Sequence, residues 1–216
     1  IINKMTKNDL PENIPIFPLS NAIFFPRTIL PLNIFETRYI QLIEDCMREK
    51  RIFGMVQPKK KLASVPEVYN VGCLGKIISF NETSDKRFII SLSGISRFTI
   101  KKELKTNKLY RIFNVDYSEF KDDLKFKRNN IISLNKNLLL KKIKLFFKKL
   151  NYTVEFDELQ KLDFDQLIST VSMISPFSTE EKQKLLEVIQ MEEKIKLLEQ
   201  IIDFNIVDLQ ENKTIQ

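Results

Sequence analysis

The spacing of apolar residues changes once along this chain of 216 residues, near residue 120. Before that point, short apolar segments alternate with polar residues and are broken by turns, a pattern typical of β-strands. After it, apolar residues recur every three or four positions, which is typical of amphipathic helices. The sequence therefore predicts an α+β fold, in which a strand-rich part is followed by a helical bundle.

The first part predicts strands and a single helix. The expected strands cover residues 14–19, 28–34, 51–57, 71–81, 86–93, 95–104 and 109–120. Between them, Tyr39, Ile43, Cys46 and Met47 follow the spacing of one helical stripe, which predicts a helix between Phe35 and Arg51. Because strands that close on themselves leave no exposed edge, we expect a small closed β-barrel with one inserted helix. Phe35 is expected to close the end of this barrel.

The second part predicts a long amphipathic helix followed by three shorter ones. Its polar stripe consists of Ser133, Asn137, Lys141, Lys144 and Lys148, and its apolar side of Ile131, Leu134, Leu138 and Leu145. Ser178 and Glu181 have the spacing of a capping box, which marks the start of a later helix. We expect a barrel over residues 13–120, a helical subdomain packed on it over residues 121–208, and flexible ends at 1–12 and 209–216.

Missing residue types exclude most catalytic and metal sites. The chain has no His, which rules out Ser-His-Asp and Cys-His catalysis and His-containing metal sites. Two separated cysteines cannot form a four-cysteine zinc site, and no phosphate-binding loop motif is present. The prediction is a protein that is not an enzyme, with no catalytic, cofactor-binding or metal-ligating residue and no cofactor.

Two local patterns have a functional and a structural interpretation. Residues 72–75 have the GXXG spacing of an RNA-binding KH clamp, but a tight turn and a close backbone approach within a barrel is the preferred interpretation. Ser91, Ser93 and Ser96 near Lys101 could suggest a Ser-Lys dyad, whereas solvent-facing serines are expected on alternating strands. Both patterns are therefore interpreted as structural.

The cysteine content and the hydropathy pattern indicate a cytoplasmic protein. Cys46 and Cys73 lie in a predicted helix and a predicted strand, and two cysteines in a chain of this length suggest reduced thiols. No apolar stretch approaches the ~20 residues that span a bilayer, and residues 1–13 are polar. No membrane partner is expected.

The charge is unevenly distributed along the chain. Residues 121–150 carry 10 Lys and Arg and 2 Asp and Glu, which gives +8, whereas residues 151–216 carry 6 and 14, which gives −8. A basic patch at Lys141, Lys144 and Lys148 would suit RNA phosphates. The alternative is that the acidic helices fold near the basic segment and partly neutralise it.

The segment between Leu19 and Thr28, with the sequence SNAIFFPR, is a candidate recognition loop. It places Ile23, Phe24 and Phe25 in a row, and neighbouring side chains of an extended segment point to opposite sides. One of them could therefore be exposed for peptide binding, since loops on a rigid barrel often carry recognition. The equally weighted alternative is that all three are buried.

A series of short motifs runs in order along the chain. The motifs are IPIFPL (14–19), FFP (24–26), LPL (30–32), FETRY (35–39), RIFG (51–54), YNVG (69–72), GISRF (94–98), PFS (176–178), EKQ (181–183) and LLE (185–187). Taken together and in this order, they resemble the amino-terminal domain of the ATP-dependent protease Lon. The resemblance covers roughly residues 13–205. It is to the stand-alone bacterial proteins that carry this LON substrate-binding, or peptidase S16 Lon-like, domain.

The resemblance implies a PUA-like β-barrel followed by a helical bundle, and a role in binding proteins. In Lon this region is thought to help select substrates and assemble the hexamer, and it contributes no catalytic residue. The expected partners are unfolded or client proteins and peptides, with self-association as a further possibility. Because other PUA-like barrels bind RNA, an RNA-binding protein that uses the basic 121–150 helix is the alternative.

Overall fold

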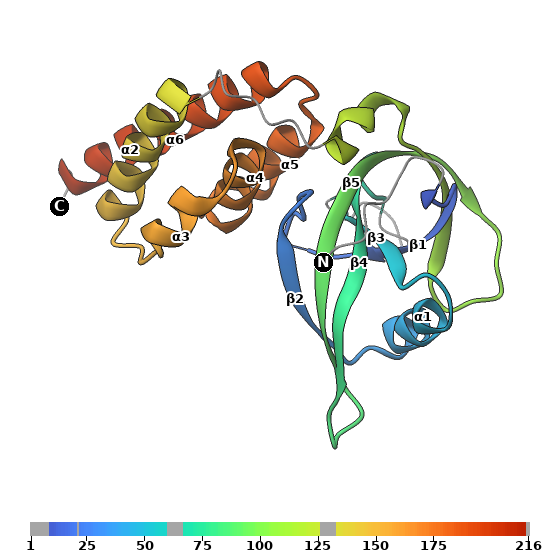
Figure 1. The fold of residues 1–216 in the computed structure, drawn as a ribbon. Helices are drawn as coiled ribbons and strands as arrows, with labels where there is room; N and C mark the ends of the chain where they lie inside the picture. The colour runs from blue at the N-terminus through green and yellow to red at the C-terminus, as the bar shows by residue number, and fades with distance from the viewer. Residues whose placement is uncertain (1–8, 21, 60–66, 126–132, 215–216) are drawn as a thin grey trace. The chain divides into compact units, whose positions relative to one another are not determined.

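The computed structural model describes residues 9–20, 22–59, 67–125 and 133–214, the side chains of 133–135 and 208–214 excepted. The chain forms two compact units, Ile1–Lys125 and Phe126–Gln216 (Figure 1). Strands make up the first unit and helices the second, so the expected α+β architecture is confirmed.

Six strands of the first unit form a nearly closed ring. They are β1 (Asn13–Pro18), β2 (Ile29–Ile34), β3 (Ile52–Val56), β4 (Val71–Glu82), β5 (Phe88–Leu104) and β6 (Arg111–Asp116). Their order is β2-β5-β4-β3-β1-β6, and β6 also pairs with β5, which brings the ring back on itself. β1 and β3 are parallel, and the other pairs are antiparallel.

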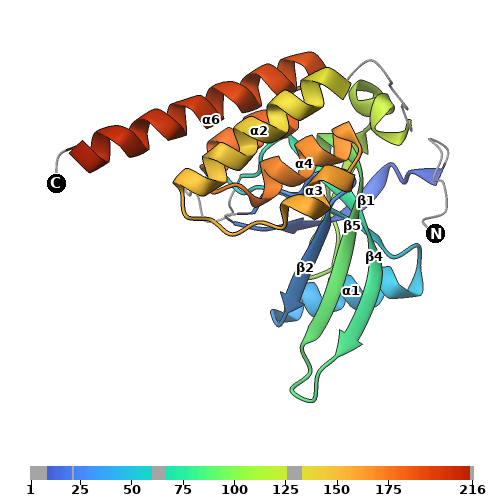
Figure 2. The same ribbon diagram turned by 60° about the vertical axis from the view of Figure 1, so that its left-hand side comes forward.

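β5 is longer than the sequence predicted. The two strands expected at 86–93 and 95–104 form one strand of 17 residues that continues through Gly94. It pairs with β2 over residues 88–93, with β4 over residues 88–99 and with β6 over residues 99–104. We call the outer three-stranded part, formed by β2 with residues 77–82 of β4 and 88–93 of β5, the wing; its strands run side by side in Figure 2.

The interior of the ring is filled from alternating positions of its strands. It includes Ile14, Ile16, Ile52, Val56, Leu74, Phe98, Phe113, Val115 and Tyr117. The inserted helix α1 (Thr37–Arg48) buries Tyr39, Leu42, Ile43 and Cys46. The Tyr39 ring stacks on Phe17 of β1 with 4.0 Å between ring centroids. Burying side chains of this size stabilises the fold by about 1.5–3 kcal/mol each, which holds α1 in place.

A short 3₁₀ segment, η2 (Ser118–Leu124), ends the first unit, and five helices form the second. The helices are α2 (Ser133–Lys149), α3 (Phe156–Lys161), α4 (Phe164–Ile174), α5 (Thr179–Glu187) and α6 (Met191–Thr214). The predicted capping box opens α5: the Ser178 hydroxyl accepts from the Glu181 backbone N–H, and the Glu181 carboxylate accepts from the Ser178 N–H. The capping box therefore provides hydrogen-bond acceptors for two backbone N–H groups at the start of α5 that have no partner within the helix.

Two details of the predicted packing were wrong. α2 buries Leu139, Ile143, Phe146 and Phe147, whereas Leu138 and Leu145, expected on its apolar side, are 63% and 50% exposed. Ile131 lies outside the described residues, as does the side chain of Leu134. Phe35, expected to close the end of the barrel, is 63% exposed.

Residues 9–12 precede β1, within the segment expected to be a flexible end. Leu10 packs into the barrel core. The Pro11 carbonyl accepts from Tyr117 Oη at 2.8 Å, and the Glu12 carbonyl accepts from the Val115 N–H at 2.8 Å. Residues 10–12 are therefore held against the strand β6 and the residue that follows it.

Candidate functional site

The predicted recognition loop lies inside the first unit. Ile23, Phe24 and Phe25 are 4%, 3% and 0% exposed. A Cβ placed on Gly75 of β4 would lie 2.8 Å from the Phe24 ring, so this ring packs directly on the backbone of the barrel. The burial alternative that the sequence left open describes these side chains, and none of the three presents a surface to a peptide.

A bulge fixes the loop to the middle of β5. The Arg27 N–H donates to the Gly94 carbonyl and the Gly94 N–H donates to the Thr28 carbonyl, each at 2.9 Å. Arg27 and Thr28 both bond to Gly94, so two residues of one strand face one residue of the other. Arg27 has a φ of 64°, the left-handed conformation of the first residue of a G1 bulge. The Thr28 hydroxyl donates to the Phe25 carbonyl at 2.7 Å and closes the turn. The loop therefore sets the point at which β2 joins the sheet.

Glycine is needed at 94 because of space. A Cβ at this position would lie 2.2 Å from the Phe25 carbonyl oxygen, well inside van der Waals contact. In the same way, a Cβ on Gly72 would lie 2.5 Å from the Met55 carbonyl oxygen. The GXXG spacing of residues 72–75 therefore reflects a close backbone approach inside β4, as preferred, although it lies within a strand and not in a turn.

The outer face of the wing is exposed and uncharged. The strand register aligns Pro31, Ser91 and Ser79 in one row across β2, β5 and β4, and Asn33, Ile89 and Asn81 in the next outward-facing row. Ile29 of β2 extends this face and is 56% exposed, and Ile89 is 47% exposed. We call these seven residues the wing face. The nearest charges along the strands are Lys76, which lies in one row with Ser93 and Ile29, and Glu82, which follows Asn81 at the end of β4.

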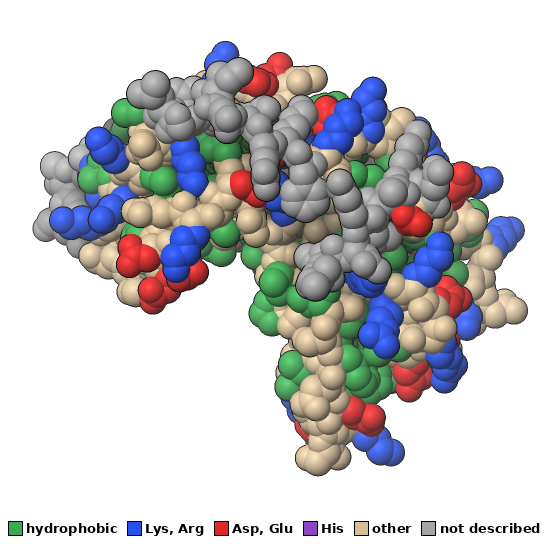
Figure 3. All heavy atoms as spheres, in the orientation of Figure 1, with side chains coloured by type: hydrophobic (Ala, Val, Ile, Leu, Met, Phe, Trp, Pro, Cys, Tyr) green, Lys and Arg blue, Asp and Glu red, His purple; other side chains and the backbone are tan. Residues whose placement is uncertain are grey.

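The space-filling view agrees with this description. Hydrophobic side chains gather along the wing in Figure 3, whereas charged ones stand at the turn between β4 and β5. Arg87 and Asp85 form an ion pair in that turn, with 2.8 Å between nitrogen and oxygen. In a chain in which 29% of residues are charged, an uncharged sheet face of this kind is a candidate for contact with apolar partners.

The free edge of β2 is less suited to binding than its face. Thr28 is hydrogen-bonded to Gly94 of β5, and along an antiparallel strand every second residue is bonded to the same neighbour. The backbone N–H and C=O groups of Leu30, Leu32 and Ile34 therefore point towards β5. Those of Ile29, Pro31 and Asn33 then point to the free edge, where Pro31 has no N–H to offer. Proline at an exposed edge hinders the addition of another strand.

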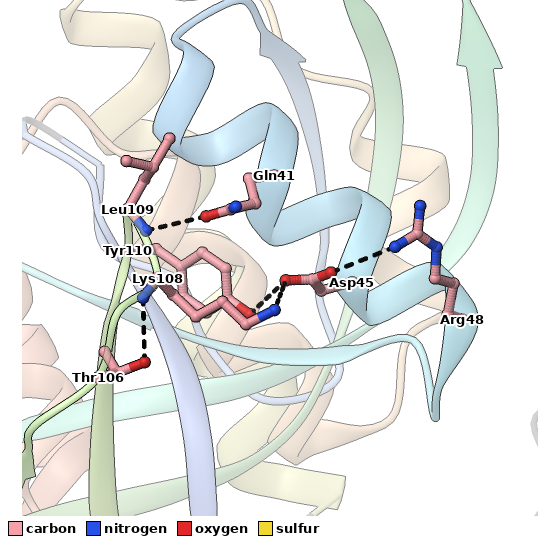
Figure 4. A network of polar contacts seen from close by, with 7 residues as sticks. All are labelled: Gln41, Asp45, Arg48, Thr106, Lys108, Leu109 and Tyr110. Carbon is pink, nitrogen blue, oxygen red and sulfur yellow. Dashed lines mark hydrogen bonds and ion pairs between the residues drawn. The ribbon is translucent and has the colours of Figure 1, made fainter.

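A polar network joins α1 to the turn between β5 and β6 (Figure 4). Asp45 Oδ2 accepts from Lys108 Nζ at 2.9 Å and from Tyr110 Oη at 2.8 Å, and the Leu109 N–H donates to Gln41 Oε1 at 2.9 Å. The hydrogen bond from Lys108 and that from Tyr110 lower the pKa of Asp45 despite partial burial, and Arg48 adds to the effect. The network positions α1 against the turn between β5 and β6.

A buried ion pair anchors the end of the first unit. The Arg97 guanidinium donates to both carboxylate oxygens of Asp123, at 2.9 and 2.7 Å, and the Arg97 backbone N–H donates to Asp123 at 2.9 Å. Both side chains are less than 10% exposed. The guanidinium also lies 4.4 Å from the Phe120 ring centroid. Breaking such a pair leaves a buried charge without a partner, so its role is structural.

The cysteines and two of the serines singled out in the sequence are buried. Ser93 and Ser96, expected to face solvent, are 6% and 0% exposed, and the Ser96 hydroxyl donates to the Arg97 carbonyl. Cys46 and Cys73 are buried free thiols, and burial raises the pKa of Cys46 to about 12, which disfavours the reactive thiolate. The described parts of the chain contain no group of His, Cys, Asp or Glu side chains that could hold a metal ion. None of the described helices is long and apolar enough to cross a membrane.

The predicted basic patch is exposed. Lys141, Lys144 and Lys148 stand on the outer side of α2, and Lys144 Nζ lies 5.7 Å from the Phe156 ring centroid. The adjacent Lys142 forms an ion pair with Asp203 of α6 at 2.7 Å. One acidic residue of the carboxyl-terminal helices thus neutralises one lysine of α2.

Solved structures show the same fold. The structure resembles the N-terminal domain of the Mycobacterium avium complex Lon protease, with a TM-score of 0.66 and 14% identity over 88% of this chain and 98% of that one. It also resembles a Lon N-terminal domain protein from Xanthomonas campestris, with a TM-score of 0.60 and 21% identity over 88% and 97% of the two chains.

Sequence relatives give the family. The Lon protease of Desulfosudis oleivorans is 28% identical over 198 residues, which are 88% of this chain and 24% of the relative. The chain spans about a quarter of the length of the curated relatives that it matches. The family described as the ATP-dependent protease La (LON) substrate-binding domain matches residues 13–203. The barrel with its wing, the helices that follow and this match together show that the chain belongs to the LON substrate-binding domain family.

Proposed function

We propose that this chain is a non-catalytic module that binds exposed apolar segments of partly unfolded proteins in the cytoplasm. The family to which it belongs is named for substrate binding. A role in presenting clients to a separate protease fits that name. The described residues offer neither a metal cluster nor an activated thiol, so binding is the function that their chemistry supports best.

The observation that carries the proposal is the wing face. Ile29 and Ile89 are about half exposed on a sheet surface whose other members are Pro31, Asn33, Ser79, Asn81 and Ser91. Apolar side chains of a client gain about 25 cal/mol for each Å² that such a contact removes from water. The lack of charge avoids the desolvation cost that buried unpaired charges would add.

The candidate loop residues have a supporting role in this proposal. Phe24 and Phe25 hold the loop against β4 and β5, and the bulge at Arg27 and Gly94 fixes the register of β2. In this account Ile23, Phe24 and Phe25 position the wing face and do not contact the client.

RNA binding through Lys141, Lys144 and Lys148 is the alternative function, supported by the exposure of these lysines on α2. It predicts affinity that falls with salt, with a log–log slope near −0.7 per phosphate contact for single strands. The exposed leucines among these lysines favour a different partner, as argued below.

A client-binding assay tests the proposal. A reduced, carboxymethylated model protein should bind the wild-type chain and should bind the double variant Ile29→Ser/Ile89→Ser at least about tenfold more weakly. Leu109→Ser is the matched control, because Leu109 is 58% exposed on the first unit but lies outside the wing face. Equal binding by the wild type and the double variant, at equal melting temperature, would count against the wing face.

A further inference from the structure

The outer side of α2 carries two exposed leucines at helical spacing. Leu138 and Leu145 are seven residues apart, so they share one side of the helix and lie roughly 10 Å apart along its axis at about 1.5 Å per residue. The opposite side is packed, since Leu139, Ile143, Phe146 and Phe147 are at most 1% exposed. The core of the second unit is therefore complete without these leucines, and their exposure needs another explanation.

Lysines flank this leucine ridge. Lys141 and Lys148 stand on one side of it and Lys142 on the other, because each follows Leu138 or Leu145 by three or four residues. α2 contains six lysines and neither Asp nor Glu. Within the described parts of the chain, the ion pair of α2 is that of Lys142 with Asp203, and Lys141 and Lys148 form none.

We infer that this side of α2 is a docking surface for an acidic amphipathic helix of a protein partner. To cover the two leucines, the partner must carry apolar side chains with a repeat of about seven residues. To pair with the lysines, it must carry carboxylates beside those apolar side chains. A helix with apolar residues at i, i+3 or i+4 and i+7, flanked by Asp or Glu, provides both. The surface is distinct from the wing face and does not depend on the function proposed for it.

The leucines also distinguish this partner from nucleic acid. Proteins that bind single strands combine basic residues with aromatic rings on which the bases stack. The outer side of α2 has lysines but presents leucine side chains between them. Leucine offers no stacking plane, and exposing it would gain nothing in contacts with phosphates.

Fluorescence anisotropy with designed peptides tests the inference. The probe is a labelled helical peptide of three heptads with Leu at the a and d positions and Glu beside them. One control peptide has Lys in place of Glu, and another has the same composition in scrambled order. A single-stranded oligouridine and vesicles of anionic lipid are the remaining probes. The full chain is used throughout.

The acidic helix should bind the wild-type chain, and its binding should weaken as salt is raised. Leu138→Ser/Leu145→Ser and Lys141→Glu/Lys148→Glu should each weaken it at least about tenfold. The matched controls are Leu109→Ser and Lys102→Glu/Lys105→Glu, which change exposed residues of the first unit and should bind as the wild type does. Because all four α2 positions are exposed, the variants should keep the wild-type melting temperature.

Three results would overturn the inference. The first is no binding of the acidic helix by the wild type, or equal binding of the scrambled or Lys-containing peptide. The second is unchanged binding by both α2 variants. The third is tighter binding of the oligouridine or the vesicles than of the acidic helix, lost in Lys141→Glu/Lys148→Glu but kept in Leu138→Ser/Leu145→Ser.

Discussion

Replacing Gly94 by alanine tests how the loop is joined to the barrel. The added methyl group would lie 2.2 Å from the Phe25 carbonyl oxygen and 3.1 Å from the Arg27 nitrogen. Both are backbone atoms, so no side-chain rotation relieves the overlap. The loop must move away by about 1 Å or more to restore ordinary contact.

The cost of that movement can be estimated from what the loop holds. Two backbone hydrogen bonds join Gly94 to Arg27 and Thr28, each worth roughly 0.5–1.5 kcal/mol. Phe25 is fully buried beside them, and losing such a ring entirely costs about 3–5 kcal/mol. We expect Gly94→Ala to lower the free energy of unfolding by about 2–4 kcal/mol, because the bonds weaken and the packing of Phe25 is partly lost.

Urea denaturation followed by circular dichroism measures this change. Gly94 is not in the left-handed region, so without the overlap Gly94→Ala would stabilise the chain by roughly 0.4–1 kcal/mol through the unfolded state. The sign of the change is therefore informative. Ser79→Ala, on the exposed wing face, is the control and should change stability by less than about 0.5 kcal/mol. A Gly94→Ala variant as stable as the control would contradict the close approach of the Phe25 carbonyl to Gly94.

Two further predictions concern stability. Phe25→Ser should lower the free energy of unfolding by roughly 3 kcal/mol or more, measured by urea denaturation, because its ring is fully buried; a variant that melts like the wild type would contradict that packing. Hydrogen bonds to Lys108 and Tyr110 lower the pKa of Asp45, and those to Ser118 lower the pKa of Asp116 to about 2. Since both carboxylates have lower pKa values when folded, their contribution is complete above the unfolded value of about 4 and is lost as the pH falls from there towards 2. The urea midpoint of the wild type should therefore fall over this range more steeply than that of Asp45→Asn, and parallel curves would contradict the role of the α1 network.

The spacing of apolar residues along the sequence allowed much of the fold to be predicted. Period-two segments located the strands, and the helical stripe through Tyr39, Ile43 and Cys46 located α1, because each element buries one face. The break expected near Gly94 did not occur. Glycine there permits close approach of another segment and leaves the strand continuous, a requirement that depends on a contact 69 residues away with Phe25.

The candidate site was harder to predict for the same reason. Leu138, Leu139 and Leu145 are equivalent as residue types, and which of them is buried depends on how α2 packs with its neighbours. Phe24 and Phe25 lie in a loop, where the sequence pattern does not distinguish an exposed side chain from a buried one. Their burial depends on the backbone of the barrel against which they pack. The wing face could not be recognised, because its rows combine residues of three strands that only the register aligns.

Methyl NMR can observe the binding of apolar client segments at the wing face residue by residue. Isoleucine δ1-methyl groups are labelled in the wild-type chain, which is then titrated with a reduced, carboxymethylated model protein. Client binding at the wing face should shift or broaden the signals of Ile29 and Ile89, with little change at the buried Ile23 or at Ile189, which is 48% exposed on the second unit. Changes confined to Ile23 or Ile189, with Ile29 and Ile89 unaffected at saturating client, would contradict it.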